Sequence, residues 1–257
     1  MPAPHRPRKR FGQHFLIDRS IIDAILAILA PQPADNVVEI GPGLGALTQP
    51  LLEVLPQITV VEIDRDIAAR LAAAWPPERL VIHQGDALDF DFSSLGSDLR
   101  LVGNLPYNIS TPLLFHLLEF LPHLRDMTFM LQKEVVARMV AQPSTPDYGR
   151  LSVMLQRHCQ LFRLLDVPPD AFDPPPKVDS AVVRLVPRQD KAPLDEGRFA
   201  RLVAAAFGQR RKVLRNTLGG LVPASVFGAL AIDPGLRAEN LAVAQFEALA
   251  AYTAPQH

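Results

Sequence analysis

Short apolar segments and amphipathic segments alternate along the first half of the chain, and this alternation constrains the fold more than any other feature. We predict strands at residues 36–40, 58–63, 80–83, 99–104 and 127–132. We predict helices between them at residues 46–55, 67–75, 112–121 and 133–140. Strand–helix alternation at this spacing is typical of a doubly wound, Rossmann-like parallel sheet of the α/β class.

The segments outside this alternation predict two further parts. An amphipathic helix is predicted at 15–30, a helix at 151–158, and strands at 161–167 and 179–186. Residues 190–257 have helical apolar spacing throughout. We therefore predict a basic arm at 1–17, an α/β domain at 18–188 and a small all-helical domain at 189–257.

Composition limits the class of protein. A chain of 257 residues that is 48% hydrophobic can form a sizeable core. Cys159 is the only cysteine, which fits a reducing compartment. Charges at Asp18, Arg19 and Asp23 interrupt the most apolar segment near the N-terminus. We expect a cytoplasmic protein with no signal peptide and no transmembrane helix.

A glycine turn follows the first predicted strand. Gly41, Gly43 and Gly45 lie between that strand and the next helix, where glycines let the backbone approach a ligand closely. The turn lacks the Gly-Lys-Ser/Thr of a P-loop, and its third glycine comes one residue early for the dinucleotide fingerprint. A tight turn without a ligand remains an alternative.

Carboxylates lie at the carboxyl ends of the next two strands. Glu62 lies about 20 residues past the glycine turn, where an acid can accept both hydroxyls of a ribose. Asp86 follows the third strand and can accept from an adenine amino group. Taken singly, each has a plain structural alternative: a solvated strand end for Glu62 and a turn or helix cap for Asp86.

The segment Asn104-Leu105-Pro106-Tyr107 follows the fourth strand and carries the sharpest chemical signal. An amide oxygen, nearby carbonyls and an aromatic ring suit the binding of a flat base that bears an exocyclic amino group. Two acceptors would make an aryl amine a better nucleophile, and the ring would stack on the base. The structural alternative is a proline turn with a core tyrosine.

Other residues suggest contacts to the base and to phosphates. Phe172 lies in a proline-rich loop, either to cover the second face of the base or to anchor the loop in the core. Lys177 is either a phosphate contact or a solvated charge. Two basic clusters suggest a nucleic-acid backbone partner, although each is alternatively a solvated face. Their members are Arg6, Arg8, Lys9 and Arg10, and then Arg210, Arg211, Lys212 and Arg215.

Several chemistries lack support in the sequence. The seven histidines show no metal-ligand spacing, and no Gly-x-Ser-x-Gly turn occurs. Cys159 follows His158, but it lies in a helix-like apolar run that predicts a buried thiol. We therefore expect neither a metal site nor a cysteine nucleophile.

The chain resembles the small-subunit ribosomal RNA adenine dimethyltransferases. The motifs that carry the resemblance are KRFGQHFL at 9–16, EIGPGLG at 39–45, EID at 62–64, GDA at 85–87, NLPY at 104–107 and FDPPPKVDS at 172–180. The resemblance implies a class I methyltransferase sheet and S-adenosylmethionine as methyl donor. It also implies dimethylation of two adjacent adenines near the 3′ end of 16S rRNA, in an immature small subunit, and we expect a monomer.

The resemblance also implies roles for individual residues. The implied catalytic residues are Asn104, Leu105, Pro106, Tyr107 and Phe172. The implied cofactor contacts are Gln13, His14, Leu16, Glu39, Gly41, Gly43, Glu62, Ile63, Asp86, Ala87 and Asn104. The RNA contacts predicted from the basic residues themselves are Arg8, Lys9, Arg10, Lys177, Arg210, Arg211, Lys212 and Arg215.

One position departs from the family, which usually has Asn where this chain has His14. A protonated imidazole beside a sulfonium is unfavourable. We therefore expect His14 to be neutral when the cofactor binds.

Three alternatives have different consequences. A 23S rRNA adenine methyltransferase of the antibiotic-resistance type would share the glycine turn and the segment at 104–107. An RNA-binding assembly factor without catalysis would keep the fold. A nicotinamide-dependent oxidoreductase would leave Asp86 and Asn104 without a role.

Overall fold

The computed structural model describes residues 13–252, so the predicted RNA contacts Arg8, Lys9 and Arg10 lie outside the described residues. The chain forms two compact units. The first comprises Met1–Val136 and Phe162–Pro187, and the second comprises Ala137–Leu161 and Arg188–His257. The predicted division had placed 137–161 in the α/β domain. The structure groups this segment with the C-terminal helices, because α6 (Arg150–His158) packs against α7 (Glu196–Phe207) and α10 (Val243–Ala251).

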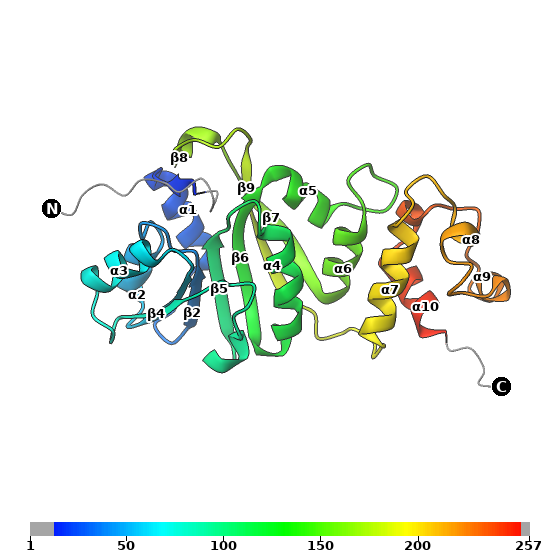
Figure 1. Ribbon diagram of the computed structural model, residues 1–257, viewed down its shortest axis with the longest axis horizontal. Coiled ribbons are helices and arrows are strands. Elements are labelled where there is room, and N and C mark those ends of the chain that lie inside the picture. Colours follow the sequence, from blue (N-terminus) through cyan, green and yellow to red (C-terminus); the bar gives the residue numbers. More distant parts are fainter. Residues whose placement is uncertain (1–12, 253–257) are drawn as a thin grey trace. The chain divides into compact units, whose positions relative to one another are not determined.

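A seven-stranded mixed sheet runs through the first unit, with strand order β4-β3-β2-β5-β6-β9-β7 (Figure 1). Strands β2 to β6 are parallel, as predicted, and β9 is antiparallel to β6. The parallel arrangement predicted for the five alternating strands is therefore confirmed, and the final strand, predicted at 179–186 without a direction, is antiparallel. The strands are β2 (Asn36–Ile40), β3 (Ile58–Glu62), β4 (Leu80–Gln84), β5 (Leu99–Asn104), β6 (Leu124–Gln132), β7 (Cys159–Val167) and β9 (Ser180–Pro187).

The strand order reverses between β2 and β5. From β2 the chain proceeds outward through β3 to β4, and it then returns to pair β5 with the other side of β2. The loops that follow β2 and β5 therefore diverge from a shared edge of the sheet. In open α/β sheets, ligands bind in the crevice at this point. The glycine turn and the segment 104–107 leave the sheet there.

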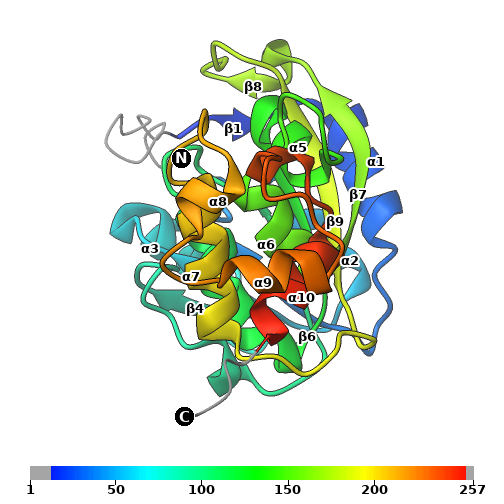
Figure 2. The same cartoon turned by 90° about the vertical axis from the view of Figure 1, so that its right-hand side faces the viewer.

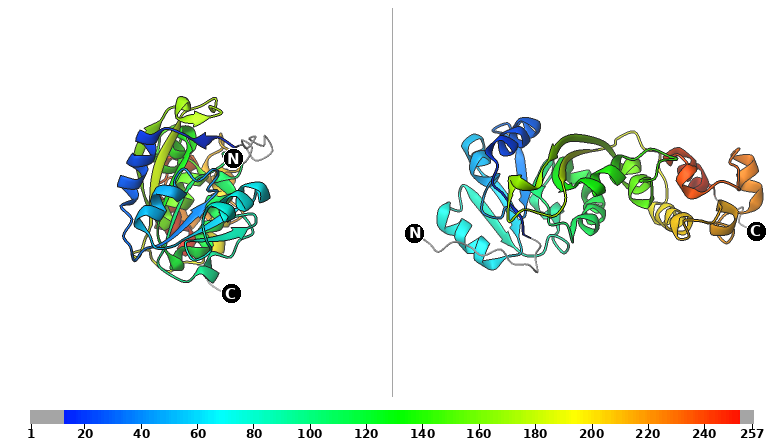
Figure 3. Two further views of the ribbon diagram at one scale, coloured as in Figure 1. Left: turned by 90° about the vertical axis from the view of Figure 1, so that its left-hand side faces the viewer. Right: turned by 90° about the horizontal axis from the view of Figure 1, so that it is seen from above.

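Helices cover both faces of the sheet (Figure 3). On one face, α1 (Arg19–Leu29), α2 (Thr48–Val54) and α3 (Arg65–Ala74) share a hydrophobic cluster with strand residues such as Val102 and Met130. On the other face, α4 (Ser110–Leu117) buries Leu113, Leu114 and Leu117. The chain continues into α5 (Lys133–Val140). Burial on both faces explains why the central strands are apolar throughout rather than alternating.

The N-terminal helix is shorter than predicted, since the expected helix at 15–30 begins only at Arg19. Asp18 ends the extended segment: its carboxylate accepts the N–H groups of Ser20 and Ile21 and caps the helix. The two residues of β1 (Phe15–Leu16) pair instead with β8 (Phe172–Asp173), as Figure 2 shows. This pairing brings the N-terminal segment beside the proline-rich loop, a contact that local spacing does not predict.

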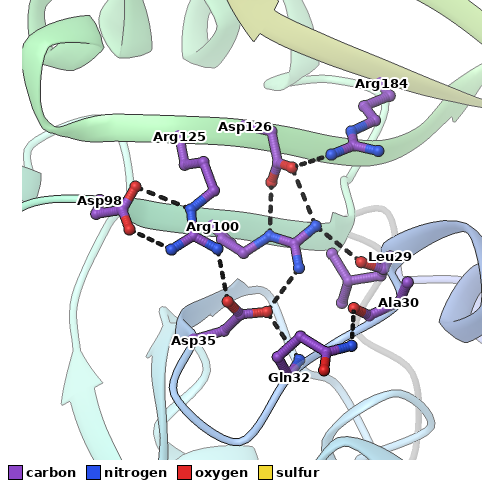
Figure 4. Close-up of polar contacts among 9 residues, drawn as sticks. All are labelled: Leu29, Ala30, Gln32, Asp35, Asp98, Arg100, Arg125, Asp126 and Arg184. Atoms are coloured by element: carbon purple, nitrogen blue, oxygen red, sulfur yellow. Dashed lines mark hydrogen bonds and ion pairs between the residues drawn. The ribbon is translucent and has the colours of Figure 1, made fainter.

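A buried ion-pair network lies at the amino ends of β5 and β6 (Figure 4). These are the opposite ends of the strands from the diverging loops. The Arg100 guanidinium contacts Asp35 at 2.7 Å and Asp126 at 3.0 Å, and it donates to the Leu29 carbonyl at 2.7 Å. Arg184 also pairs with Asp126. The network therefore connects the end of α1 to two central strands and to β9.

The second unit is built mainly from helices, as predicted for the C-terminal segment (Figure 2). In addition to α6, α7 and α10, it contains α8 (Leu214–Thr217) and α9 (Ala224–Ala229). Arg157 is fully buried here, 4.9 Å from the Phe199 ring centroid, and its charge is paired with Glu196 and Glu247.

Cys159 is buried, as predicted, but it begins β7 rather than lying in a helix. Burial raises the pKa of its thiol to about 12. Since the thiolate is the nucleophilic form, this environment disfavours the nucleophile reading.

Candidate active site

A cavity of about 640 Å³ lies at the carboxyl ends of β2, β3 and β5. Five segments supply most of its lining, namely residues 13–17, 39–47, 61–63, 85–87 and 104–109. All eleven predicted cofactor contacts line the cavity, and so do the four residues from Asn104 to Tyr107. The structure therefore brings together residues that are far apart in the sequence.

The glycine turn forms one wall of the cavity. Gly41 and Gly43 have positive φ angles of 67° and 54°, a conformation that glycine adopts without strain. A Cβ on Gly43 would lie 3.1 Å from the Phe15 ring. The turn thus presents a backbone surface that side chains would fill, which suits close approach of a ligand.

A glycine on β5, Gly103, explains how closely β2 and β5 meet below the cavity. A Cβ on Gly103 would lie only 2.4 Å from the Ile40 carbonyl oxygen. Since this distance is shorter than a van der Waals contact, only glycine fits here without backbone movement. The position therefore fixes the separation between the glycine turn and Asn104.

Two buried carboxylates lie at the ends of neighbouring strands. Burial raises the pKa of Glu62, and a Glu62 carboxylate oxygen accepts the Asp64 N–H at 2.7 Å. Burial also raises the pKa of Glu39 to about 7, while its carboxylate accepts the Thr48 hydroxyl at 2.6 Å. A positively charged ligand in this cavity would favour the ionised forms of both groups.

Asp86 fits both interpretations of its role, the cap of a turn and an acceptor for a ligand amino group. Its carboxylate accepts the Leu88 N–H at 2.9 Å, so it caps a turn, and it also lines the cavity. The capping bond uses one oxygen lone pair of a group that has several. The structural role therefore leaves capacity for a ligand amino group.

Several hydrogen bonds hold the segment from Asn104 to Tyr107 in place. Asn104 Nδ2 donates to the His14 carbonyl at 2.9 Å, and the Leu105 N–H donates to the Met130 carbonyl at 3.1 Å. The Pro106 carbonyl accepts the Ile109 N–H at 3.2 Å. The Tyr107 hydroxyl lies 2.6 Å from Ser180 Oγ. The amide of Asn104 is therefore oriented with Oδ1 as its remaining acceptor.

His14 connects three parts of the site. Its Nδ1 donates to the Pro174 carbonyl at 2.7 Å, which requires a proton on that nitrogen. Its ring is stacked near Tyr107, with centroids 5.8 Å apart and planes 27° apart. The imidazole therefore has a defined position beside the predicted stacking ring.

Phe172 differs from the prediction that its ring covers the second face of a base. The side chain is 2% exposed and belongs to the hydrophobic cluster under α1, and it is not among the residues that line the cavity. The alternative weighed from the sequence, a loop anchor in the core, describes this position. The reason is the β1·β8 pairing, which turns the ring inward.

The predicted RNA contacts that the structure describes are exposed, namely Lys177, Arg210, Arg211, Lys212 and Arg215. Arg210 donates to the Pro146 carbonyl and lies 3.6 Å from Glu239, so part of its charge is balanced within the second unit.

Neither a metal site nor a membrane-spanning helix occurs among residues 13–252. His, Cys, Asp and Glu side chains between residues 13 and 252 form no group of three that could hold a metal ion. None of the helices in this part of the chain combines the length and apolar character that crossing a bilayer requires.

A family model for ribosomal RNA adenine dimethylases matches residues 4–254. The chain belongs to the ribosomal RNA adenine dimethylase family. The dimethylase is 68% identical over 252 residues to the ribosomal RNA small subunit methyltransferase A of Thiobacillus denitrificans, covering 97% of this chain and 99% of that protein. It is 62% identical to the protein of the same name from Aromatoleum aromaticum, covering 98% and 96%. The dimethylase is thus an enzyme of ribosomal RNA methylation.

Solved structures support the same fold. A dimethyladenosine transferase from Plasmodium falciparum matches with a TM-score of 0.80 and 26% identity, covering 92% of this chain and 96% of that one. The 23S rRNA methyltransferase ErmE matches with a TM-score of 0.72 and 26% identity, covering 91% and 97%. The class I methyltransferase fold expected from the sequence is therefore confirmed.

Sequence reasoning missed part of the site. Phe15, Ile17 and Asn108 also line the cavity of the dimethylase, and Ser180 contacts Tyr107. Ser180 ends the FDPPPKVDS motif at 172–180. Its contact with Tyr107 joins residues 73 apart, which local sequence patterns do not predict. Only the pairing of β9 with β6 brings it there.

Proposed function

We propose that this dimethylase transfers methyl groups from S-adenosylmethionine to the N6 amino groups of two adjacent adenines in the 3′-terminal hairpin loop of 16S rRNA. The observation that carries the proposal is the orientation of Asn104. Its Nδ2 donates to the His14 carbonyl, so Oδ1 is the atom left to accept from an amino group in the cavity.

The residues present fit the cofactor. The Glu62 carboxylate suits two ribose hydroxyls, and Asp86 suits an adenine amino group. The positive-φ backbone at Gly41 and Gly43 leaves a surface without side chains for the amino-acid part of the donor. When bound, S-adenosylmethionine supplies an electrophilic methyl group.

The chain's contribution to the reaction is positioning and polarisation. An adenine amino nitrogen is a poor nucleophile, because its lone pair is delocalised into the ring. Asn104 Oδ1 and a backbone carbonyl would accept its two N–H groups and favour a pyramidal nitrogen. The Leu105 carbonyl suits the second role better than that of Pro106, which already accepts from Ile109. Tyr107 would stack on the base, worth about 1–3 kcal/mol.

The proton balance requires no strong base in the chain. The bound donor would supply the methyl group and leave as neutral S-adenosylhomocysteine, and the methylated amino group would release one proton to water. The chain would accelerate the transfer mainly by holding the amino nitrogen in position for attack on that methyl group. A second transfer to the same nitrogen then gives the dimethylated base.

The substrate assignment to 16S rRNA is supported by the 57–68% identity to small-subunit relatives. The structural similarity to ErmE favours a second candidate, methylation of 23S rRNA, since both share the fold. The identity to ErmE is only 26%, so the small-subunit substrate is the better supported. We further propose that the enzyme acts as a cytoplasmic monomer on immature small subunits.

The test is incubation with isotopically labelled methyl donor and purified immature 30S or 50S particles, followed by mapping of the labelled nucleotides. We expect label on N6 of two adjacent adenines of 16S rRNA. Label in 23S rRNA would establish the second candidate. Label on ribose, pyrimidine or protein, or no label with intact particle binding, would contradict the proposed chemistry.

Exposed cations of the second unit are proposed to contact the RNA backbone. Arg211 and Lys212 are exposed and adjacent. Replacing both with Glu should weaken particle binding and reduce its salt dependence, without changing affinity for S-adenosylhomocysteine. Unchanged particle binding at low salt would rule out this footprint.

A further inference from the structure

The ring of Tyr107 is held through its hydroxyl by a residue from a distant part of the chain. The hydroxyl lies 2.6 Å from the Oγ of Ser180, the first residue of β9. Ser180 is fully buried, and its strand partner is Gln132 on β6. The Ser180 hydroxyl is therefore placed by the sheet itself and not by a mobile loop.

A second contact, with the His14 ring, covers one face of the Tyr107 ring. The His14 ring is stacked near Tyr107, and a hydrogen bond from Nδ1 to the Pro174 carbonyl holds the imidazole in place. With one side occupied, the other face of Tyr107 is the one available to a base. A ring that is tethered at its hydroxyl and backed on one side has few orientations.

We propose that Ser180 is a positioning residue, which sets the angle at which Tyr107 stacks on the target adenine. This inference rests on the proposed function. Ser180 does not line the cavity and acts only through the Tyr107 hydroxyl. Orientation matters because a small misplacement of the acceptor nitrogen from the line of attack reduces the rate strongly. A tether fixed by the sheet maintains this geometry before the base arrives.

The mechanism predicts a specific division of kinetic effects. Loss of the tether misorients the bound base, so kcat should fall while KM for the particle changes little. Losing one such hydrogen bond should lower kcat about fivefold to tenfold. Affinity for S-adenosylhomocysteine should be unchanged, because Ser180 does not line the cavity and its loss removes no predicted cofactor contact.

The test is a double-mutant cycle on labelled methyl transfer to immature 30S particles. Ser180→Ala and Tyr107→Phe each remove one end of the hydrogen bond and keep the ring. We expect each to lower kcat by a similar factor, and we expect the double variant to be no slower than either single variant. The matched control is Ser152→Ala, which removes another fully buried hydroxyl, bonded to the Arg138 carbonyl in the second unit.

The outcomes distinguish the failures. Multiplicative losses in the double variant, or an unchanged kcat in Ser180→Ala, would overturn the positioning role. Multiplicative losses would mean that Ser180→Ala slows transfer equally with and without the Tyr107 hydroxyl, which is a purely structural effect. If the wild-type enzyme itself does not methylate adenine N6, the proposed function fails instead.

Discussion

Gly103 and Ile40 lie so close that a Cβ on the glycine would be 2.4 Å from the isoleucine carbonyl oxygen. The obstructing atom belongs to the backbone of β2, so no side-chain rotation can relieve the contact. The two strands that carry the glycine turn and the Asn104 segment therefore depend on one glycine for their spacing.

Gly103→Ala should consequently lower both stability and cofactor affinity. Forcing the strands apart should lower the free energy of unfolding by about 1–3 kcal/mol. Urea unfolding and titration with S-adenosylhomocysteine measure the two effects. Gly85→Ala is the control for stability, because a Cβ there meets nothing within 4 Å. Equal stability of the two variants would refute the steric argument.

Asn104→Ala should abolish methyl transfer while particle binding persists. The substitution removes the proposed acceptor for the amino group, and loss of one such contact typically lowers kcat by about 10²–10³-fold. It also removes the bond to the His14 carbonyl. Single-turnover transfer and a particle-binding assay separate the two functions. Unchanged methylation would eliminate the proposed role of the amide.

Glu39→Gln should change how stability depends on pH. Burial raises the pKa of Glu39 from 4.5 to about 7, so between these values the unfolded chain loses a proton that the folded chain keeps. The Glu39 carboxyl therefore lowers the free energy of unfolding as pH rises through this window, by about 3 kcal/mol in all. The contribution is constant below pH 4.5 and above pH 7.

The amide of the Gln variant can still accept the Thr48 hydroxyl, but it does not titrate. The free energy of unfolding of the variant minus that of the wild type should therefore increase as pH rises through the same window. Urea unfolding without cofactor at several pH values measures the difference. Parallel curves for the two proteins would contradict the buried-carboxyl argument.

Arg100→Ala should be strongly destabilising. Removing the guanidinium breaks its buried ion pairs with Asp35 and Asp126, although Arg125 still contacts Asp35 and Arg184 still contacts Asp126. The loss should therefore lie near the lower end of the about 3–5 kcal/mol typical of an unpaired buried charge. Arg65→Ala is a matched control, because Arg65 pairs with Asp66 at 3.9 Å while 81% exposed. It should change stability by less than about 1 kcal/mol. Similar effects of the two substitutions, measured by urea unfolding, would show that burial of the network contributes little.

The sequence by itself determined the α/β class and most of the cavity lining. Apolar strands that alternate with helices have few ways to bury both faces, and parallel strands carry their carboxyl ends to one edge. Glu62 and Asn104 end their strands and Asp86 follows the strand between them in the sequence, so their convergence could be predicted from the order of strands and helices. The site could be predicted because each of these polar side chains lies at the carboxyl end of a strand that apolar spacing already predicts.

Only the tertiary structure decided the contacts between distant segments. The antiparallel strand β9 places Ser180 at Tyr107, and the pairing of β1 with β8 shortens α1 and turns Phe172 into the core. Packing of α6 against α7 and α10 assigns Ala137–Leu161 to the second unit. These features depend on burial and on hydrogen bonds between residues far apart in the chain. Local periodicity carries no information about such partners, because the same short segment is compatible with several of them.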